Sequence, residues 1–171
     1  ILFYVDTCSR KWGSPYLSKD FFQQLKGALA HLTWACFAEV DHKIVASSLF
    51  FQRGKHLYGR YWGCEEQVKF LHFELCYHQP IELCLRMGWS RFEAGAQGNH
   101  KLKRGLLAHP TYSLHYLNYP PLYNGVQQAL QDEKEDLLIA LQDINEHAPI
   151  KEEHQRNWYQ LIERLSQANQ H

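Results

Sequence analysis

The feature that most constrains the fold of this chain is a change of hydrophobic period near Leu32. Before that point apolar residues recur about every 3.6 positions, as they do on one face of a helix. Beyond it apolar and polar residues alternate, as they do along a half-buried strand. The alternating runs occupy residues 33–39, 43–52 and 56–62, and the short turns between them lie at residues 41–42 and 53–55. Three strands joined by tight turns predict an antiparallel meander.

Helical patterns precede the meander. Residues 1–11 have apolar side chains at helical spacing, and the run Trp12-Gly13-Ser14-Pro15 ends that pattern. Ser18 can cap a second helix over residues 19–29, because its hydroxyl can accept a hydrogen bond from a free amide of the first turn. We therefore expect two short helices ahead of the first strand.

A crossover follows the meander. Residues 70–87 predict a helix, in which Pro80 should kink or restart the backbone because proline cannot donate a hydrogen bond. Gly88 suits the end of this helix, and a short strand at 89–94 would complete a crossover of βαβ type. The other expected elements are a strand at 112–117, a long helix at 120–147 and a final helix after Pro149. The expected class is α+β, a mixed sheet flanked by helices with a C-terminal helical extension.

Composition excludes several functional classes. Lysine and arginine total 18, and aspartate and glutamate also total 18, so no global basic field attracts DNA. The five cysteines contain no CxxC pair, which indicates free thiols and a cytoplasmic protein without a zinc ribbon. No apolar run approaches the roughly 18 residues of a membrane span.

Side chains that could do chemistry are densest between residues 56 and 105. The candidates are Arg60, His72, Glu74, Glu93, Gln97, His100, Lys101 and Arg104. Tyr58 and Arg60 should share one face of the third strand and Tyr61 the other, since successive side chains point to opposite faces.

A loop rich in glycine and basic residues, Gly95 to Gly105, reads GAQGNHKLKRG. Backbone amides and cationic side chains acting together suit a phosphate, pyrophosphate or carboxylate. The residues that we expect to bind such an anion are Gly95, Gln97, Gly98, Lys101 and Arg104, with Arg60 from the third strand. The alternative is a basic surface loop with no ligand.

Two carboxylates are candidates for a general base. Glu74 is the first residue of the polar face of the crossover helix. The alternative to a role as general base is a glutamate that is only solvated or paired with another side chain. Glu93 lies at the end of the strand that follows. The alternative to a role as general base is that Glu93 forms an ion pair with Arg91 or Arg60. His100 is the third candidate. The sequence His72-Phe73-Glu74 has the H-x-E pattern of zinc deaminases, but residues 80–84 lack the second P-C-x-x-C part, so we expect no metal.

Four stretches resemble one protein family: LYGRYWG, FLHFELCYHQPIE, RFEAGAQGNHKLKRG and PTYSLHYL. They are similar to the predicted N-acyltransferases related to Fem-type peptidyltransferases, in the GNAT superfamily. Fem enzymes carry two GNAT-like domains and move an aminoacyl group from tRNA to peptidoglycan precursors. The resemblance covers about residues 4–151. It implies a GNAT-like domain at 1–151, a helical tail at 152–171 and a missing N-terminal partner domain.

The resemblance also implies N-acyltransferase activity by direct attack of an amine. Glu74, or else Glu93 or His100, would accept the amine proton, and Lys101 and Arg104 would hold a phosphate-bearing substrate. Acyl-CoA or aminoacyl-tRNA would be the co-substrate, with no bound cofactor, and the acceptor would be an amine-bearing small molecule or peptide. The ordinary CoA signature, Q/R-x-x-G-x-G/A, is absent. The alternative is therefore a non-catalytic half that binds a ligand or dimerises, and a homodimer would cover surface left by the missing half.

Overall fold

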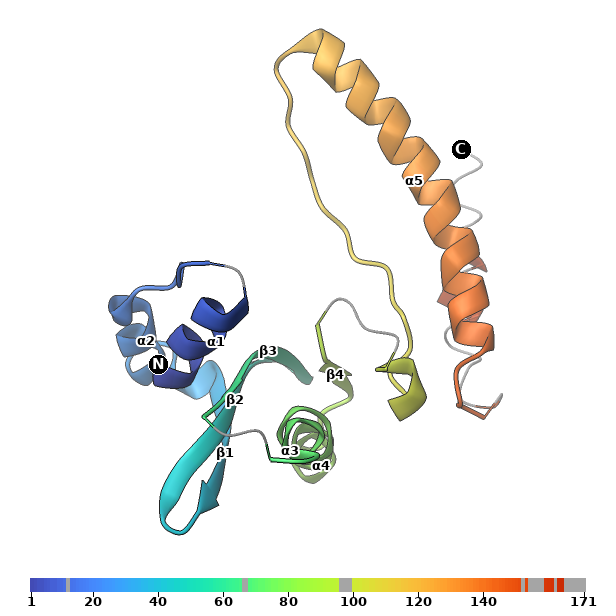
Figure 1. Cartoon of the computed structure of the whole chain (residues 1–171). Coiled ribbons are helices and arrows are strands. Elements are labelled where there is room, and N and C mark those ends of the chain that lie inside the picture. The colour runs from blue at the N-terminus through green and yellow to red at the C-terminus, as the bar shows by residue number, and fades with distance from the viewer. Residues whose placement is uncertain are drawn as a thin grey trace. The chain divides into compact units, whose positions relative to one another are not determined.

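The structure is a computed structural model that describes residues 1–11, 13–65, 68–95, 100–151, 153, 159–161 and 163–164 (Figure 1). It divides into two compact units, Ile1–Gln97 and Gly98–His171. The expected division into a domain at 1–151 and a tail at 152–171 stays a prediction.

A four-stranded mixed sheet forms the centre of the first unit. Its strands are β1 (Thr33–Val40), β2 (Lys43–Arg53), β3 (His56–Cys64) and β4 (Arg91–Glu93), in the order β1-β2-β3-β4. The first three are antiparallel neighbours, whereas β4 runs parallel to β3. The predicted meander, the crossover strand and the α+β class are therefore confirmed.

The predicted crossover helix contains a change of helix type. It consists of α3 (Leu71–Phe73), a π-helical turn η2 (Glu74–His78) and α4 (Gln79–Met87). Pro80 lies in the first turn of α4, directly after the π-helical turn, so the helix type changes next to this proline while the backbone stays helical on both sides. Gly88 ends the helix with φ 65°, and its amide donates to carbonyls of the last turn.

One face of the sheet packs against this helix. Phe50, Leu57 and Cys84 form a buried cluster. Partly buried apolar side chains surround it, namely Trp34, Cys36, Leu83, Trp89 and Phe92. Ser48 lies on the same face as Phe50, and its hydroxyl donates to the Leu75 carbonyl at 2.7 Å. The crossover helix is thus fixed to the sheet by apolar packing and a buried hydrogen bond.

Helices α1 (Leu2–Lys11) and α2 (Lys19–Lys26) precede the sheet, followed by the short 3-10 helix η1 (Ala30–Leu32). Ser18 caps α2 as predicted, since its Oγ accepts from the Phe21 amide at 3.3 Å. The helix ends at Lys26, three residues before the predicted end, because Gly27 has φ −100° and ψ −109°, outside the helical region.

Helix α1 packs closely against β3. Thr7 Oγ1 donates to the Trp62 carbonyl at 3.3 Å, and Arg10 Nη2 donates to the Cys64 carbonyl at 2.8 Å. Between these two carbonyls lies Gly63, where an added Cβ would be 2.6 Å from the Phe3 Cβ. Real Cβ atoms do not approach so closely, so only glycine fits at this helix–strand contact.

The change Gly63→Ala should therefore lower the free energy of unfolding by roughly 1–3 kcal/mol, the usual cost of overpacking. Denaturant unfolding measures the loss, and exchange of the Thr7 and Trp62 amides reports whether α1 separates from β3. Gly13→Ala is the matched control, because nothing lies within 4 Å of the added Cβ. Equal stability of the two variants would contradict the close contact.

The second unit contains η3 (Leu102–Arg104) and the long helix α5 (Pro120–Glu146), as predicted for residues 120–147. Leu141 is buried against Leu107 and Ala108, whereas Leu130 and Leu137 of the same helix are 41% and 42% exposed. Most of the predicted final helix lies outside the described residues.

The predicted strand at 112–117 is wrong. This segment has no regular secondary structure, and the side chains of Tyr112, Leu114 and Tyr116 are 77%, 101% and 91% exposed. Alternation of apolar residues favours a strand only where another strand supplies backbone hydrogen bonds. No described strand pairs with this segment.

A buried asparagine ties α5 to the segment before it. Asn145 is 1% exposed; its Nδ2 donates to the Ala108 carbonyl at 3.0 Å, and its Oδ1 accepts from the Ala108 amide at 2.9 Å. One side chain therefore satisfies both backbone groups of a residue that has no strand or helix to do so.

Replacing Asn145 with alanine should destabilise the second unit by roughly 1–3 kcal/mol, because it removes two hydrogen bonds to partly buried backbone groups of Ala108. Hydrogen exchange of the Ala108 amide in the full chain measures the effect, and we expect faster exchange. Asn124→Ala on the exposed surface of the same helix is the control. Unchanged exchange at Ala108 would show that water replaces the side chain at no cost.

Candidate functional site

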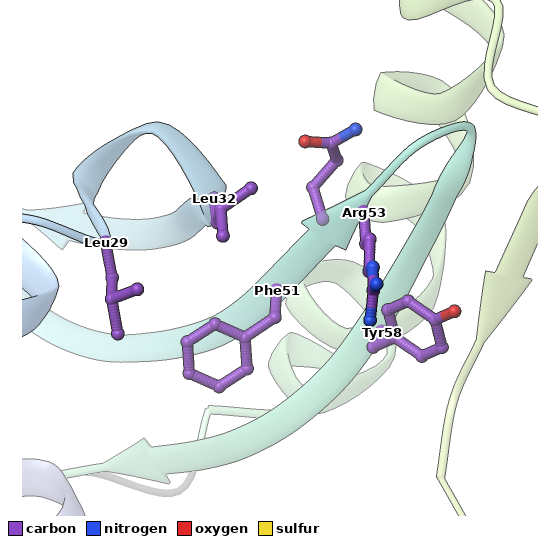
Figure 2. A pocket seen from close by; sticks show the side chains of 6 residues that line it. Leu29, Leu32, Phe51, Arg53 and Tyr58 are labelled. Carbon is purple, nitrogen blue, oxygen red and sulfur yellow. The ribbon is translucent and has the colours of Figure 1, made fainter.

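The sheet face opposite the crossover helix contains a hollow of about 430 Å³ (Figure 2). Small-molecule sites usually have volumes of roughly 300–1,000 Å³. Phe51 lies on this face because Phe50, its neighbour in β2, faces the helix. The residues that line the hollow are Leu29, Leu32, Phe51, Gln52, Arg53 and Tyr58.

Polar side chains of β3 and β4 lie on the same face. Tyr58 is opposite Phe51 in β2 and in register with Glu93 in β4, and residues in register share a face. The Tyr58 hydroxyl lies 3.3 Å from His56 Nδ1. Glu93 Oε1 forms an ion pair with Arg91 Nε at 2.9 Å, which is the alternative that the sequence left open.

A β-bulge in β3 changes the predicted faces of that strand. Phe50 pairs with Gly59, and Leu49 pairs with Tyr61, so Arg60 has no opposite residue. Tyr61 therefore lies on the same face as Tyr58. The prediction that they face opposite sides is wrong, because a bulge adds one residue to the alternation.

The bulge brings Arg60 into a cluster of tyrosines. Arg60 Nη2 donates to the Tyr16 hydroxyl at 2.8 Å, and its Cζ lies 4.6 Å from the centre of the Tyr61 ring. The hydroxyls of Tyr16 and Tyr61 form a short hydrogen bond, and the Tyr4 hydroxyl accepts from the Tyr16 amide at 3.0 Å. Burial raises the pKa of Tyr61, and the hydrogen bond with Tyr16 raises it further. No local sequence pattern indicates this cluster, because Tyr16 and Tyr61 are 45 residues apart.

Glu74 lies in the π-helical turn of the crossover helix, which covers the other face of the sheet. Its exposed carboxylate accepts from Gln79 Nε2 at 2.8 Å and lies 3.5 Å from His78 Nδ1. The two candidate carboxylates thus lie in different layers, and only Glu93 shares a face with the hollow.

The glycine-rich loop crosses the boundary between the two units. Gly95, with φ 78°, ends the described part of the first unit, and the predicted ligands Gln97 and Gly98 lie outside the described residues. In the second unit, Arg104 Nη1 donates to the His100 carbonyl. Burial lowers the pKa of the Lys101 ammonium, which follows His100 directly.

The cysteines are free thiols. Burial raises the pKa of Cys36 and Cys84, and it raises the pKa of Cys76 to about 12. Thiols with raised pKa values are poor nucleophiles at neutral pH. Among the described residues no group of three or more His, Cys, Asp or Glu side chains could hold a metal ion, and no helix is long and apolar enough to cross a membrane.

Comparison with known proteins identifies a family. The model of the FemAB-like family, described as peptidoglycan biosynthesis/recognition, matches residues 1–152. No curated protein matches the chain. Among solved structures, a ribosomal-protein-alanine N-acetyltransferase from Brucella melitensis biovar Abortus 2308 is 15% identical, with a TM-score of 0.42 over 58% of this chain and 79% of that chain.

Proposed function

Because the chain belongs to the FemAB-like family of peptidoglycan biosynthesis/recognition, we propose that it transfers an acyl or aminoacyl group to an amine. The observation that carries this proposal is the family match over residues 1–152, which include the whole sheet and the glycine-rich loop. The family resemblance read from the sequence is thereby confirmed, and a Fem-type family is associated with acyl or aminoacyl transfer in general.

Direct transfer requires a neutral amine. The amine nitrogen attacks the acyl carbon, backbone amides stabilise the oxyanion, and the thiol of CoA or the ribose hydroxyl of tRNA leaves with a proton. Of the three candidate bases we choose Glu93, since it shares a face with the hollow and Arg91 orients its carboxylate at 2.9 Å. Lys101 and Arg104 would bind phosphate groups of the donor.

One observation favours a second candidate function. Glu74 and Glu93 both have cationic or hydrogen-bonding partners in the protein, as structural carboxylates do. A half-domain that binds a ligand or dimerises, while another domain performs the chemistry, would have this property.

The test combines the protein with acyl-CoA or aminoacyl-tRNA and a mixture of amine acceptors. The proposal expects an amide product by mass spectrometry and thermal stabilisation by one donor, about 2.7 kcal/mol at 100 times its Kd. Lys101→Ala and Arg104→Ala should reduce this stabilisation, and Lys103→Ala, in the same short helix, is the matched control. Stabilisation without product would favour the binding half-domain. The absence of both with every donor would contradict the proposal.

A further inference from the structure

The hollow in Figure 2 has apolar walls that remain partly open to water. Leu29 and Leu32 come from the η1 region, and Phe51 and the Tyr58 ring come from the sheet. All four side chains are half-buried. An aliphatic or aromatic group that entered the hollow would remove this surface from water, which is favourable.

Arg53 is the charged residue of this lining, and its side chain is exposed. Among the described residues, none accepts a hydrogen bond from the Arg53 guanidinium or forms an ion pair with it. The other polar groups here are engaged: Gln52 Nε2 donates to the Gly54 carbonyl, and the Tyr58 hydroxyl lies 3.3 Å from His56 Nδ1. A guanidinium offers planar donors that match a carboxylate.

The charges near the hollow also favour an anion. Arg53 ends β2 and Lys55 lies in the turn that follows, and Arg91 in β4 is in register with His56 in β3. Glu93 is an acidic residue at these strand ends, and its carboxylate already forms an ion pair with Arg91. Arg53 and Lys55 would attract a carboxylate at this end of the hollow and would repel a cationic group at the same position.

We propose that the hollow binds the apolar side group of a carboxylate-bearing substrate, whose carboxylate pairs with Arg53. This inference rests on the proposed function, because it makes that compound the amine acceptor, an amino acid with an apolar side chain. The amine would then lie toward β4, where Glu93 is located. In this proposal the lining of the hollow selects the class of acceptor, which the family match alone does not indicate.

The test is an NMR titration of the whole chain, without any acyl donor, with phenylacetate, phenylacetamide and phenethylamine. The first two have nearly the same shape and differ in charge. We expect phenylacetate to bind about fivefold more tightly than the amide, since the guanidinium is exposed and water weakens the pair. Shifted signals should come from Leu29, Leu32 and Phe51.

Arg53→Gln should abolish the preference for the carboxylate and leave binding of the amide unchanged. Lys55→Gln is the matched control, because it removes a neighbouring charge that does not line the hollow. Leu32→Trp should fill the hollow and weaken both ligands; if that variant does not fold, the Arg53 comparison still decides. Equal binding of acid and amide, stronger binding of the amine, or an equal loss in Lys55→Gln would overturn the inference. Because no donor is present, a failure of acyl transfer leaves this result unaffected.

Discussion

Replacing Glu93 with glutamine should lower kcat/KM for amide formation by roughly 10²–10⁴-fold, the usual contribution of a positioned general base. Glutamine has nearly the same shape but cannot accept a proton from the amine. The ion pair with Arg91 is partly exposed, with side-chain exposures of 36% and 37%, so its loss should change stability by only about 0–1 kcal/mol. Steady-state kinetics measure the effect, with whichever of acyl-CoA or aminoacyl-tRNA yields the amide product, and a melt confirms that the variant is folded.

The matched control is Glu82→Gln, an exposed carboxylate on α4 that belongs to no candidate site. Its kcat/KM should equal that of the unchanged protein. If Glu93→Gln were equally active, Glu93 would be a structural partner of Arg91 alone. A larger loss in Glu74→Gln than in Glu93→Gln would move the role of base to the other face of the sheet.

The second large effect concerns the core. Phe50→Ala should lower the free energy of unfolding by roughly 3–5 kcal/mol, because it removes a large buried side chain and leaves a cavity. Phe50 is 2% exposed, and its ring centre lies 6.3 Å from that of Phe92. The variant loses contacts with the crossover helix and with β4 together, since Cys84 and Phe92 both pack in this cluster.

Denaturant unfolding of the full chain measures this loss. Phe37→Ala on β1 is the matched control, because Phe37 is 59% exposed and its removal should cost no more than about 1 kcal/mol. Similar losses in the two variants would mean that the Phe50 cluster does not hold the crossover helix on the sheet.

The parts of the fold that could be predicted from the sequence are those that depend on residues close together along the chain. Alternation and turn residues predicted the meander, Ser18 and Gly88 predicted two helix ends, and Pro80 indicated an irregularity in the crossover helix, which the structure shows as a change of helix type. Each of these depends on interactions within a few positions. The strand at 112–117 failed because a strand also needs a distant partner, which a single segment cannot reveal.

The candidate site was less predictable for the same reason. The pair Arg91–Glu93 was one of the alternatives, because two residues in one strand separated by one position share a face. The bulge at Arg60 depends on the register between β2 and β3. The hollow combines side chains that precede the sheet with others from β2 and β3, and it leaves no repeating pattern in the sequence.

The packing of α1 on β3 has a consequence for association between molecules. β4 pairs with β3 only from His56 to Tyr58, so the rest of that strand edge could bind a strand of another chain. Thr7 and Arg10 occupy the Trp62 and Cys64 carbonyls along it. If α1 separated from the sheet, these carbonyls would become a template for aggregation. Protection of this strand edge is therefore coupled to a helix contact that only glycine at position 63 permits.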